Sequence, residues 1–369
     1  STATGEAYLL VAGKPVTLQW EIPGNRPVVQ GNGTNTVLLI TSAGVTVRGL
    51  RITGGKGAEG IYGMDGGGIC IFVGAGAQGA VWIDACQIDG NTCPSDETYD
   101  GGGGGIYCGG TFCTCFEIGI TGCEIWGNDV PGNGGGLLCG LLSQVWIEDS
   151  WIECNAADDR GGAVFLDSFA LSMVTNSFLV GNAARGDANR PGWGGKGGGV
   201  HCDGGAVCHI SDSEIVANRA RYFGGGIFTL SSLRRAAVCE SSPTNRQFFS
   251  VCAVSTMVES CLLASNLAGH SGGGAYLREH GYLAFRGSTC YRNDAAIDGG
   301  GVFAGEESGD GAVVEFAAEC LLEGNECAGR GGGVYLGAGG AVAVADSRFL
   351  GNSAGTEGGA AFLGIDTQA

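Results

Sequence analysis

The chain has 369 residues, of which 74 are glycine and 17 are cysteine; 44% are hydrophobic, and the formal charge is -18. A chain this apolar can bury a core, and its glycines lack the three-residue period of collagen, which excludes a disordered or collagen-like protein. The negative charge repels nucleic acid and anionic membrane surfaces, so we expect neither as a partner. No run of 18 apolar residues occurs, so we expect no membrane span.

The cysteine content favours an oxidising compartment, and we therefore expect an extracellular or cell-surface protein. Metal frameworks need cysteine pairs at set spacing, but no C-x-x-C pair occurs, and the C-x-C at Cys113 and Cys115 stands alone. We expect no metal and no cofactor.

The first motif in chain order runs from Gly74 to Gly79 and has the G-x-G-x-x-G spacing of a dinucleotide-binding loop. Such a loop needs a helix after the third glycine, whose N-terminus faces the pyrophosphate. Residues 80–89 instead alternate apolar and polar positions with period two, which is typical of a strand. We predict a turn between two strands here, and no nucleotide site.

A repeat with a base unit of 27 residues runs through the chain, with insertions in some units. In nine units a Ser or Cys stands five residues before an Asn. The Asn column comprises Asn91, Asn128, Asn155, Asn182, Asn218, Asn266, Asn293, Asn325 and Asn352. The Ser/Cys column comprises Cys86, Cys123, Ser150, Ser177, Ser213, Cys261, Ser288, Cys320 and Ser347. Because Asn tolerates left-handed backbone and its amide can bond to the same group one coil away, we interpret its column as structural.

A glycine cluster and a short apolar strand follow each Asn, as in GGGIY and GGAVF. Short strands separated by Gly and Asn turns, in units of this length, are typical of a parallel β-helix in which each unit is one coil. We predict an all-β parallel β-helix, a solenoid of about ten coils that forms one domain over residues 1–369. Residues 1–36 are expected to be an irregular first coil, 227–256 a coil with a long inserted loop, and 361–369 the start of an incomplete last coil.

These repeats resemble right-handed parallel β-helix proteins of the pectate-lyase-like superfamily. They resemble more closely the repeats of bacterial polymorphic outer-membrane proteins, whose signature combines a GGA(I/V) strand with F-x-x-N. SRFLGN and GGAVF match that signature, SFLVGN places its Phe one residue earlier, and VTVRGLRITGG from Val45 resembles a first coil. The resemblance covers about residues 37 to 363. It implies the fold and leaves the activity open, because unrelated functions share this scaffold.

Strand alternation predicts which side chains face the interior. The first and third residues after the glycines are mainly aliphatic and should point inward, so the second should point outward. That second position holds Tyr107, Leu138, Phe165, His201, Phe228, Tyr276, Phe303, Tyr335 and Phe362. We refer to these residues as the aromatic stripe. It is either a ligand or assembly surface, or it is covered by inserted loops or by stacking between coils.

Cysteines in one column on adjacent coils are expected about 4.8 Å apart at Cα, within the range that a disulfide tolerates. The predicted bridges are Cys86 with Cys123, Cys108 with Cys139, and Cys239 with Cys252, the last closing the longest insertion. Cys290 has two candidate partners, Cys261 and Cys320, between which the sequence does not choose. The alternative is that inward cysteines are small buried hydrophobic residues.

No complete catalytic set is found. Asp158 and Asp159 form a DD pair like that of polygalacturonases, but no GHG motif accompanies it, and a solvated turn explains it. The YGMD at residues 62–65 resembles an alginate epimerase motif without its histidine. The best surface for a sugar is formed by residues that share two outward columns, Trp82, Asp84, Trp146 and Glu148.

Neither end carries a capping helix, so the rod could stack head to tail into a filament. The alternative explanation is that the chain is a fragment of a longer surface protein. We therefore expect a secreted or cell-surface structural or adhesive protein that self-associates as a homo-oligomer. The alternative function is a carbohydrate-active enzyme, a lyase or hydrolase, or a carbohydrate-binding module, with polysaccharide as the partner.

Overall fold

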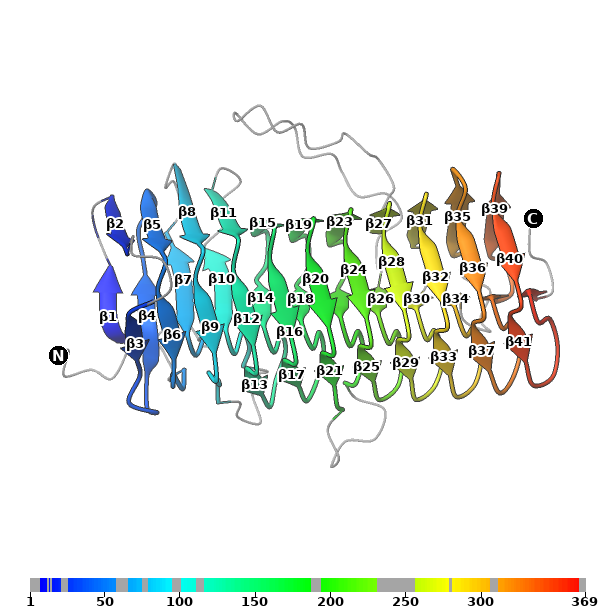
Figure 1. Cartoon of the computed structure of the whole chain (residues 1–369), viewed down its shortest axis with the longest axis horizontal. Helices are drawn as coiled ribbons and strands as arrows, with labels where there is room; N and C mark the ends of the chain where they lie inside the picture. Colours follow the sequence, from blue (N-terminus) through cyan, green and yellow to red (C-terminus); the bar gives the residue numbers. More distant parts are fainter. Residues whose placement is uncertain are drawn as a thin grey trace.

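The structure is a computed structural model of the chain. It describes residues 7–11, 13, 15–20, 26–57, 66–74, 79–94, 101–110, 116–186, 194–230, 256–278, 281–305 and 311–364. These residues form strands and turns, and none of their segments is a helix that could cross a membrane. The strands stack into a rod (Figure 1). All their pairings are parallel, in one sheet of 12 strands, two of 11 and one of 8.

The first two sheets, here called A and B, have one strand in each coil. Sheet A comprises β1 (Ala7–Val11), β4 (Thr36–Ile40), β7 (Ile69–Val73), β10 (Ile106–Gly110), β14 (Leu137–Cys139), β18 (Val164–Leu166), β22 (Val200–Cys202), β26 (Ile227–Leu230), β30 (Ala275–Arg278), β34 (Val302–Ala304), β38 (Val334–Leu336) and β42 (Ala361–Leu363). Sheet B comprises β2 (Val16–Gln19), β5 (Val45–Arg48), β8 (Gly79–Asp84), β11 (Phe116–Thr121), β15 (Gln144–Glu148), β19 (Leu171–Thr175), β23 (Val207–Ser211), β27 (Thr256–Glu259), β31 (Tyr282–Arg286), β35 (Val313–Ala317) and β39 (Ala341–Val344).

Sheets C and D are built from shorter strands. Sheet C comprises β3 (Val28–Gln30), β6 (Arg51–Thr53), β9 (Gln87–Asp89), β12 (Glu124–Trp126), β16 (Trp151–Glu153), β20 (Phe178–Val180), β24 (Glu214–Val216), β28 (Leu262–Ala264), β32 (Thr289–Tyr291), β36 (Leu321–Glu323) and β40 (Arg348–Leu350). Sheet D comprises β13 (Asp129–Val130), β17 (Ala156–Ala157), β21 (Ala183–Ala184), β25 (Arg219–Ala220), β29 (Leu267–Ala268), β33 (Asp294–Ala295), β37 (Glu326–Cys327) and β41 (Ser353–Ala354).

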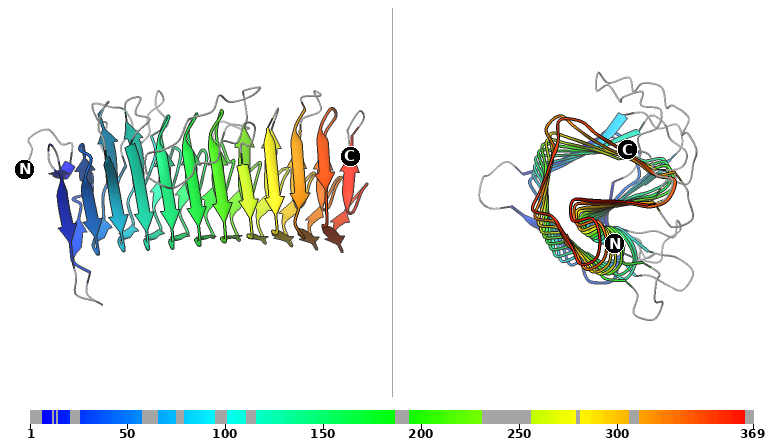
Figure 2. Two further views of the ribbon diagram at one scale, coloured as in Figure 1. Left: turned by 90° about the horizontal axis from the view of Figure 1, so that it is seen from above. Right: turned by 90° about the vertical axis from the view of Figure 1, so that its right-hand side faces the viewer.

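The chain is an all-β parallel β-helix, as the 27-residue repeat predicts. The described residues contain eleven coils with strands in sheets A, B and C, and β42 begins another, close to the predicted ten. Viewed along the rod, the coils superpose into one outline (Figure 2). The first coil is regular where it is described, because β1, β2 and β3 pair with β4, β5 and β6, although the sequence predicted an irregular coil. Residues 231–255, within the long insertion, lie outside the described residues.

The interior follows the alternation that the sequence predicts. Val164 and Leu166, the first and third residues of β18, are completely buried, and the same positions are buried in β10 and β38. The strand β8 begins at Gly79, where a nucleotide-binding loop would place a helix, so the glycine motif lies between two strands of one coil. Residues 75–78 of the motif lie outside the described part.

The asparagine column forms a continuous ladder of side-chain amides. Asn155 Nδ2 donates to Asn182 Oδ1 at 3.1 Å, and the Asn155 backbone N–H donates to the same oxygen at 3.0 Å. The same Nδ2 also donates to the Ile125 carbonyl of the preceding coil at 2.9 Å. This pattern repeats from Asn91 to Asn352, and each amide therefore connects its coil to the coils before and after it.

Left-handed backbone occurs beside the asparagines and not at them. The residue directly before the Asn has positive φ, for example Gly181 at 64° and Ala217 at 56°. A second left-handed corner precedes the Ser/Cys column, as at Asn176 with φ 47°. The asparagines thus act through their amides, while a neighbouring residue, often glycine, makes the sharp bend.

The Ser/Cys column forms a second, weaker ladder. The Ser150 N–H donates to Ser177 Oγ at 3.1 Å, and Ser150 Oγ donates to the Glu148 carbonyl at 2.8 Å. Cysteine thiols take the place of the hydroxyls in other coils, as where Cys123 Sγ donates to the Ile83 carbonyl at 3.3 Å. Serine and cysteine can both occupy this column because both are small and both donate a hydrogen bond.

The predicted disulfides between coils are wrong. Cys108 and Cys139 are register partners, and the β9–β12 register places Cys86 beside Cys123, yet none of the thirteen cysteines in the described residues is bridged. In parallel strands the Cβ vectors of register partners run side by side, so the Cβ atoms stay about 4.8 Å apart, beyond the ~3.5–4.5 Å of a disulfide. Burial instead raises the pKa of the Cys86 thiol to about 11.

Of the other predicted bridges, the one from Cys290 is also absent, and the one between Cys239 and Cys252 lies outside the described residues. Cys290 is unbridged, and its register partners are Leu263 and Leu322 instead of another cysteine. The inward cysteines act as small buried groups, which was the alternative interpretation.

We predict that Asn218→Ala lowers the free energy of unfolding by at least about 3 kcal/mol. The substitution leaves the buried amide of Asn182 and the Leu179 carbonyl without their partners. Urea unfolding followed by circular dichroism measures the change. Asn352→Ala, at the partly exposed end of the ladder, is the matched control and should cost about 1 kcal/mol. Equal losses would contradict the ladder's role.

We predict that Ala217→Gly raises the free energy of unfolding by about 1 kcal/mol, because φ 56° strains an alanine and not a glycine. The reverse change, Gly127→Ala, tests the same corner position three coils closer to the N-terminal end. A Cβ there meets no atom within 4 Å, so backbone strain alone should lower stability, by about 1 kcal/mol. Thermal unfolding of both variants checks the opposite signs.

Candidate functional site

The aromatic stripe is a stack of rings that runs along the outer side of sheet A. His201 stacks on Phe228 with ring centroids 4.6 Å apart, and Tyr276 stacks on Phe303 at the same distance. From Phe165 to Phe362, strand register places each ring directly against the ring one coil away, whereas Leu138 separates Tyr107 from Phe165. The alternation rule therefore places these side chains outside the interior, and stacking holds them together.

The stripe is nonetheless buried, which corrects its interpretation as an open ligand or assembly surface. From Tyr107 to Tyr335 its members are at most 9% exposed, and Phe362, in the last strand, is partly exposed. The turn that leads from sheet D back to sheet A covers it. Lys196 Nζ lies 5.8 Å from the centre of the Phe228 ring, and Phe223 packs 4.8 Å from Tyr276. The stripe is a second apolar core outside the coil interior.

A cluster of charged groups borders the stripe near its middle. Arg160 Nη1 lies 2.9 Å from Asp203 Oδ2, and Arg160 Nε lies 3.4 Å from Asp159 Oδ2. Burial, together with the nearby Asp203 carboxylate, raises the pKa of Asp167. Burial lowers the pKa of Lys196. Perturbed groups of this kind occur at active sites and in structural ion-pair networks.

The geometry of this cluster favours a structural network. Arg160 forms ion pairs with the carboxylates of Asp159 and Asp203. No group of three or more metal-ligating side chains lies together in the described part of the chain. His201 is buried between Phe165 and Phe228, so it occupies a ring position in the stack. Burial lowers the pKa of His201 well below its usual value, and the nearby Arg160 and Lys196 add to this effect.

We predict that the free energy of unfolding decreases as the pH falls below 6.5, because His201 is buried in its neutral form. The unfolded chain binds a proton on this imidazole below 6.5, whereas the folded chain does not, so stability is lost by about 1.4 kcal/mol per pH unit down to the folded pKa. His201→Phe keeps a stacked ring and removes the pH-dependent loss of stability that the imidazole causes. Thermal unfolding between pH 7 and pH 5 should separate the two curves; parallel curves would contradict the prediction.

The DD pair is used for salt bridges between coils. Asp158 Oδ1 accepts from Arg185 Nε at 2.7 Å, and Arg185 Nη1 also donates to Asp129 Oδ2 at 2.9 Å. One guanidinium thus joins three successive coils beside sheet D. The pair has a structural partner, and residues 61–65, which include YGMD, lie outside the described residues.

The predicted sugar surface on sheet B is not open. The register places Trp82, Gly119 and Trp146 in one outward column, with Asp84 and Glu148 in another, as the sequence indicates. Trp146 is 4% exposed, and the Trp82 ring occupies the space that a Cβ at Gly119 would need. Asp84 pairs with a neighbouring arginine. The tryptophans pack against the rod.

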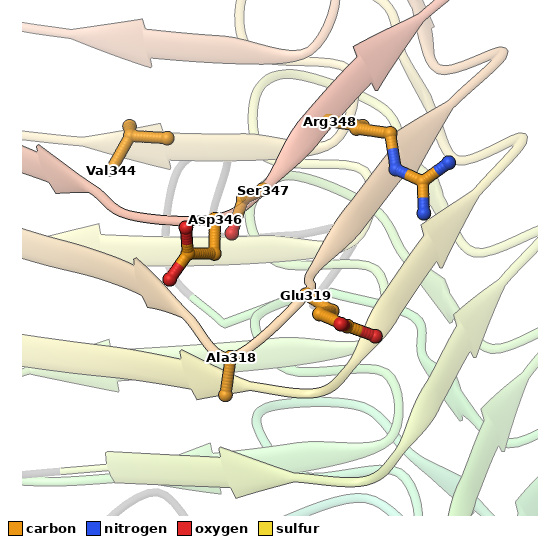
Figure 3. A pocket seen from close by; sticks show the side chains of 6 residues that line it. All are labelled: Ala318, Glu319, Val344, Asp346, Ser347 and Arg348. Atoms are coloured by element: carbon orange, nitrogen blue, oxygen red, sulfur yellow. The ribbon is translucent and has the colours of Figure 1, made fainter.

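A cavity of about 790 Å³ lies at the C-terminal end of the rod, at the corner between sheets B and C (Figure 3). Its lining residues are Ala318, Glu319, Val344, Asp346, Ser347 and Arg348. It holds two carboxylates, a hydroxyl and a guanidinium, and Ala318 and Glu319 both adopt positive φ. It contains no histidine or cysteine and no nucleophile paired with a base, so it is a shallow feature of the rod end.

Sequence reasoning missed two exposed aromatic side chains on the outer face of sheet C. Trp126 in β12 and Trp151 in β16 are each 41% exposed on the outer face of sheet C. The signal was present in CEIWGN and SWIECN, where the first and third residues after the Ser/Cys column point outward by the same alternation rule. Applied to sheet C, the rule finds both tryptophans.

No protein-family model matches the chain, and neither a curated protein nor a solved structure does.

Proposed function

We propose that the protein is a non-enzymatic structural rod that associates end to end with further copies of itself. The observation that carries the proposal is the exposure of inward-facing hydrophobic side chains in the last described coil. Val344 and Leu363 are 50% and 41% exposed, whereas their register partners one coil inward, Phe316 and Leu336, are completely buried. Another coil placed against this end would bury them.

The first coil presents a matching surface. Val16, Leu18 and Val29 pack on the interior but remain partly exposed, as Val342 and Phe349 do at the other end. Within the described residues, β2 and β39 each pair with one neighbouring strand, so one edge of each has no strand partner there. Such edges invite pairing with another chain, and the contact of one end with the other is heterologous and can repeat.

The surface location and the adhesive role remain part of this proposal. They are supported by the resemblance of the repeats to those of bacterial surface proteins. The cysteine argument for an oxidising compartment loses its support, because the thirteen described cysteines are unbridged. The carbohydrate alternative is not favoured by the geometry, because the tryptophans on which it depended are packed against the rod.

We predict that the purified protein forms particles longer than one rod by negative-stain electron microscopy, with a mass that rises with concentration in sedimentation velocity. The double variant Val344→Lys, Leu363→Lys places charges on the open interior and should remain monomeric.

Leu267→Lys is the control, because Leu267 is 36% exposed in the middle of the rod and should not affect assembly. Thermal unfolding confirms that each variant is folded. A wild-type protein that stays monomeric at all concentrations would overturn the proposal.

A further inference from the structure

We propose that the outer face of sheet C around β12, β16 and β20 is a docking surface for an extended cationic peptide segment rich in arginine or lysine. The strands lie side by side in the face turned toward the viewer in Figure 1. We call this surface the acidic aromatic face; it comprises Glu124, Trp126, Asp149, Trp151, Glu153, Phe178, Asp212 and Glu214. The inference is independent of end-to-end association, because it concerns the flank of the rod.

Tryptophans and carboxylates alternate on this face. The register pairs Glu124 with Trp151 and Trp126 with Glu153, so each indole lies beside a carboxylate of the adjacent coil. Trp151 stacks on Phe178 with ring centroids 4.6 Å apart, and its Nε1 donates to Glu153 Oε2 at 2.7 Å. The positions of these side chains are thus fixed before any partner arrives.

Trp126 has no stacking or hydrogen-bonding partner in the described part of the chain, and it is 41% exposed. An exposed indole face beside a carboxylate is a favourable environment for a guanidinium or ammonium group, since the cation gains from both the ring and the negative charge.

The negative charge of this face is unbalanced over its central coils. Asp149, Glu153, Asp212 and Glu214 have no ion pair with a lysine or arginine among the described residues. Closer to the N-terminal end of sheet C, the chain supplies its own cations. Arg51 donates from Nε and Nη2 to the two oxygens of Asp89, at 2.9 and 2.7 Å. The central coils lack this compensation and are complementary to a cationic partner.

The same sheet shows how a cation fits an aromatic ring here. In β32 the Arg292 guanidinium lies 4.9 Å from the centre of the Tyr291 ring. Tyr291 and Trp126 occupy the same column of sheet C, and the residue after each is a left-handed corner. At Trp126 that corner is Gly127, and a Cβ there meets no atom within 4 Å. The position that Arg292 fills beside Tyr291 is open beside Trp126.

Charge selects the occupant. A net charge of -18 repels anionic polymers and membrane surfaces. A neutral sugar chain would use the indole rings and leave the carboxylates uncompensated. A basic peptide uses both, because rings and carboxylates lie beside one another between β12 and β16.

The test uses the Val344→Lys, Leu363→Lys protein, so that its result does not depend on assembly. Binding of a fluorescent hexa-arginine peptide is measured by anisotropy at 0.15 M salt, with hexaglutamate and cellohexaose as comparison probes. We expect hexa-arginine alone to bind, and Trp126→Ala to weaken it on the order of 10-fold.

Matched variants separate a docking surface from general attraction. Glu153→Gln should weaken binding several-fold, whereas Glu326→Gln, on sheet D, should leave it within about twofold. Trp20→Ala removes an indole that is 38% exposed at the rod's N-terminal end and should have no effect. Equal losses in Glu153→Gln and Glu326→Gln, no loss in Trp126→Ala, or binding of cellohexaose in place of the peptide would each overturn the proposal.

Discussion

The structure depends on one constraint, that successive coils stack in register, and from Asn91 to Asn352 each coil holds that register with an asparagine. Each buried Asn accepts two hydrogen bonds on Oδ1, from the side chain and the backbone of the Asn before it, and donates to a carbonyl of the preceding coil. Because an unsatisfied buried amide is costly, a coil that slipped by one residue would lose all of these bonds at once. The ladder fixes the register of the coils, and that register aligns the interior side chains, the aromatic stripe and the salt bridges between coils.

The ladder also explains where the repeat tolerates insertions. The five-residue spacing between the Ser/Cys and Asn columns is the same in all nine units, because it spans a sheet C strand between two left-handed corners. The variation in unit length falls elsewhere: residues 187–193 precede a glycine cluster, and residues 231–255 follow a sheet A strand. Those junctions carry no bond of either ladder, so extra residues there leave the register intact.

The sequence predicted the features that depend on period and alternation. The repeat gave the parallel β-helix, and parity placed Val164 and Leu166 inside and Phe165 outside. Parity could not show that the turn holding Lys196 lies over the stripe, because burial of an outward residue depends on the path of another segment. The disulfide prediction failed because it considered Cα spacing and not the direction of the Cβ bonds. The same alternation rule also places Trp126 and Trp151 on the outside, but tryptophan does not recur at their positions in the repeat.

The amide ladder has a direction. From Asn91 to Asn325, each Asn of the ladder donates to the Oδ1 of the next Asn toward the C-terminal end, and each Oδ1 accepts from the N-terminal side, beginning with the Gly55 N–H on Asn91. The aligned amides give the rod a donor end and an acceptor end that differ chemically. The ladder begins in the third coil, so another rod cannot extend it directly, but rods that stack with their strands parallel place unlike ends in contact. A fibre built from such units would be polar, with subunits added at its two tips by different chemistry and therefore at different rates.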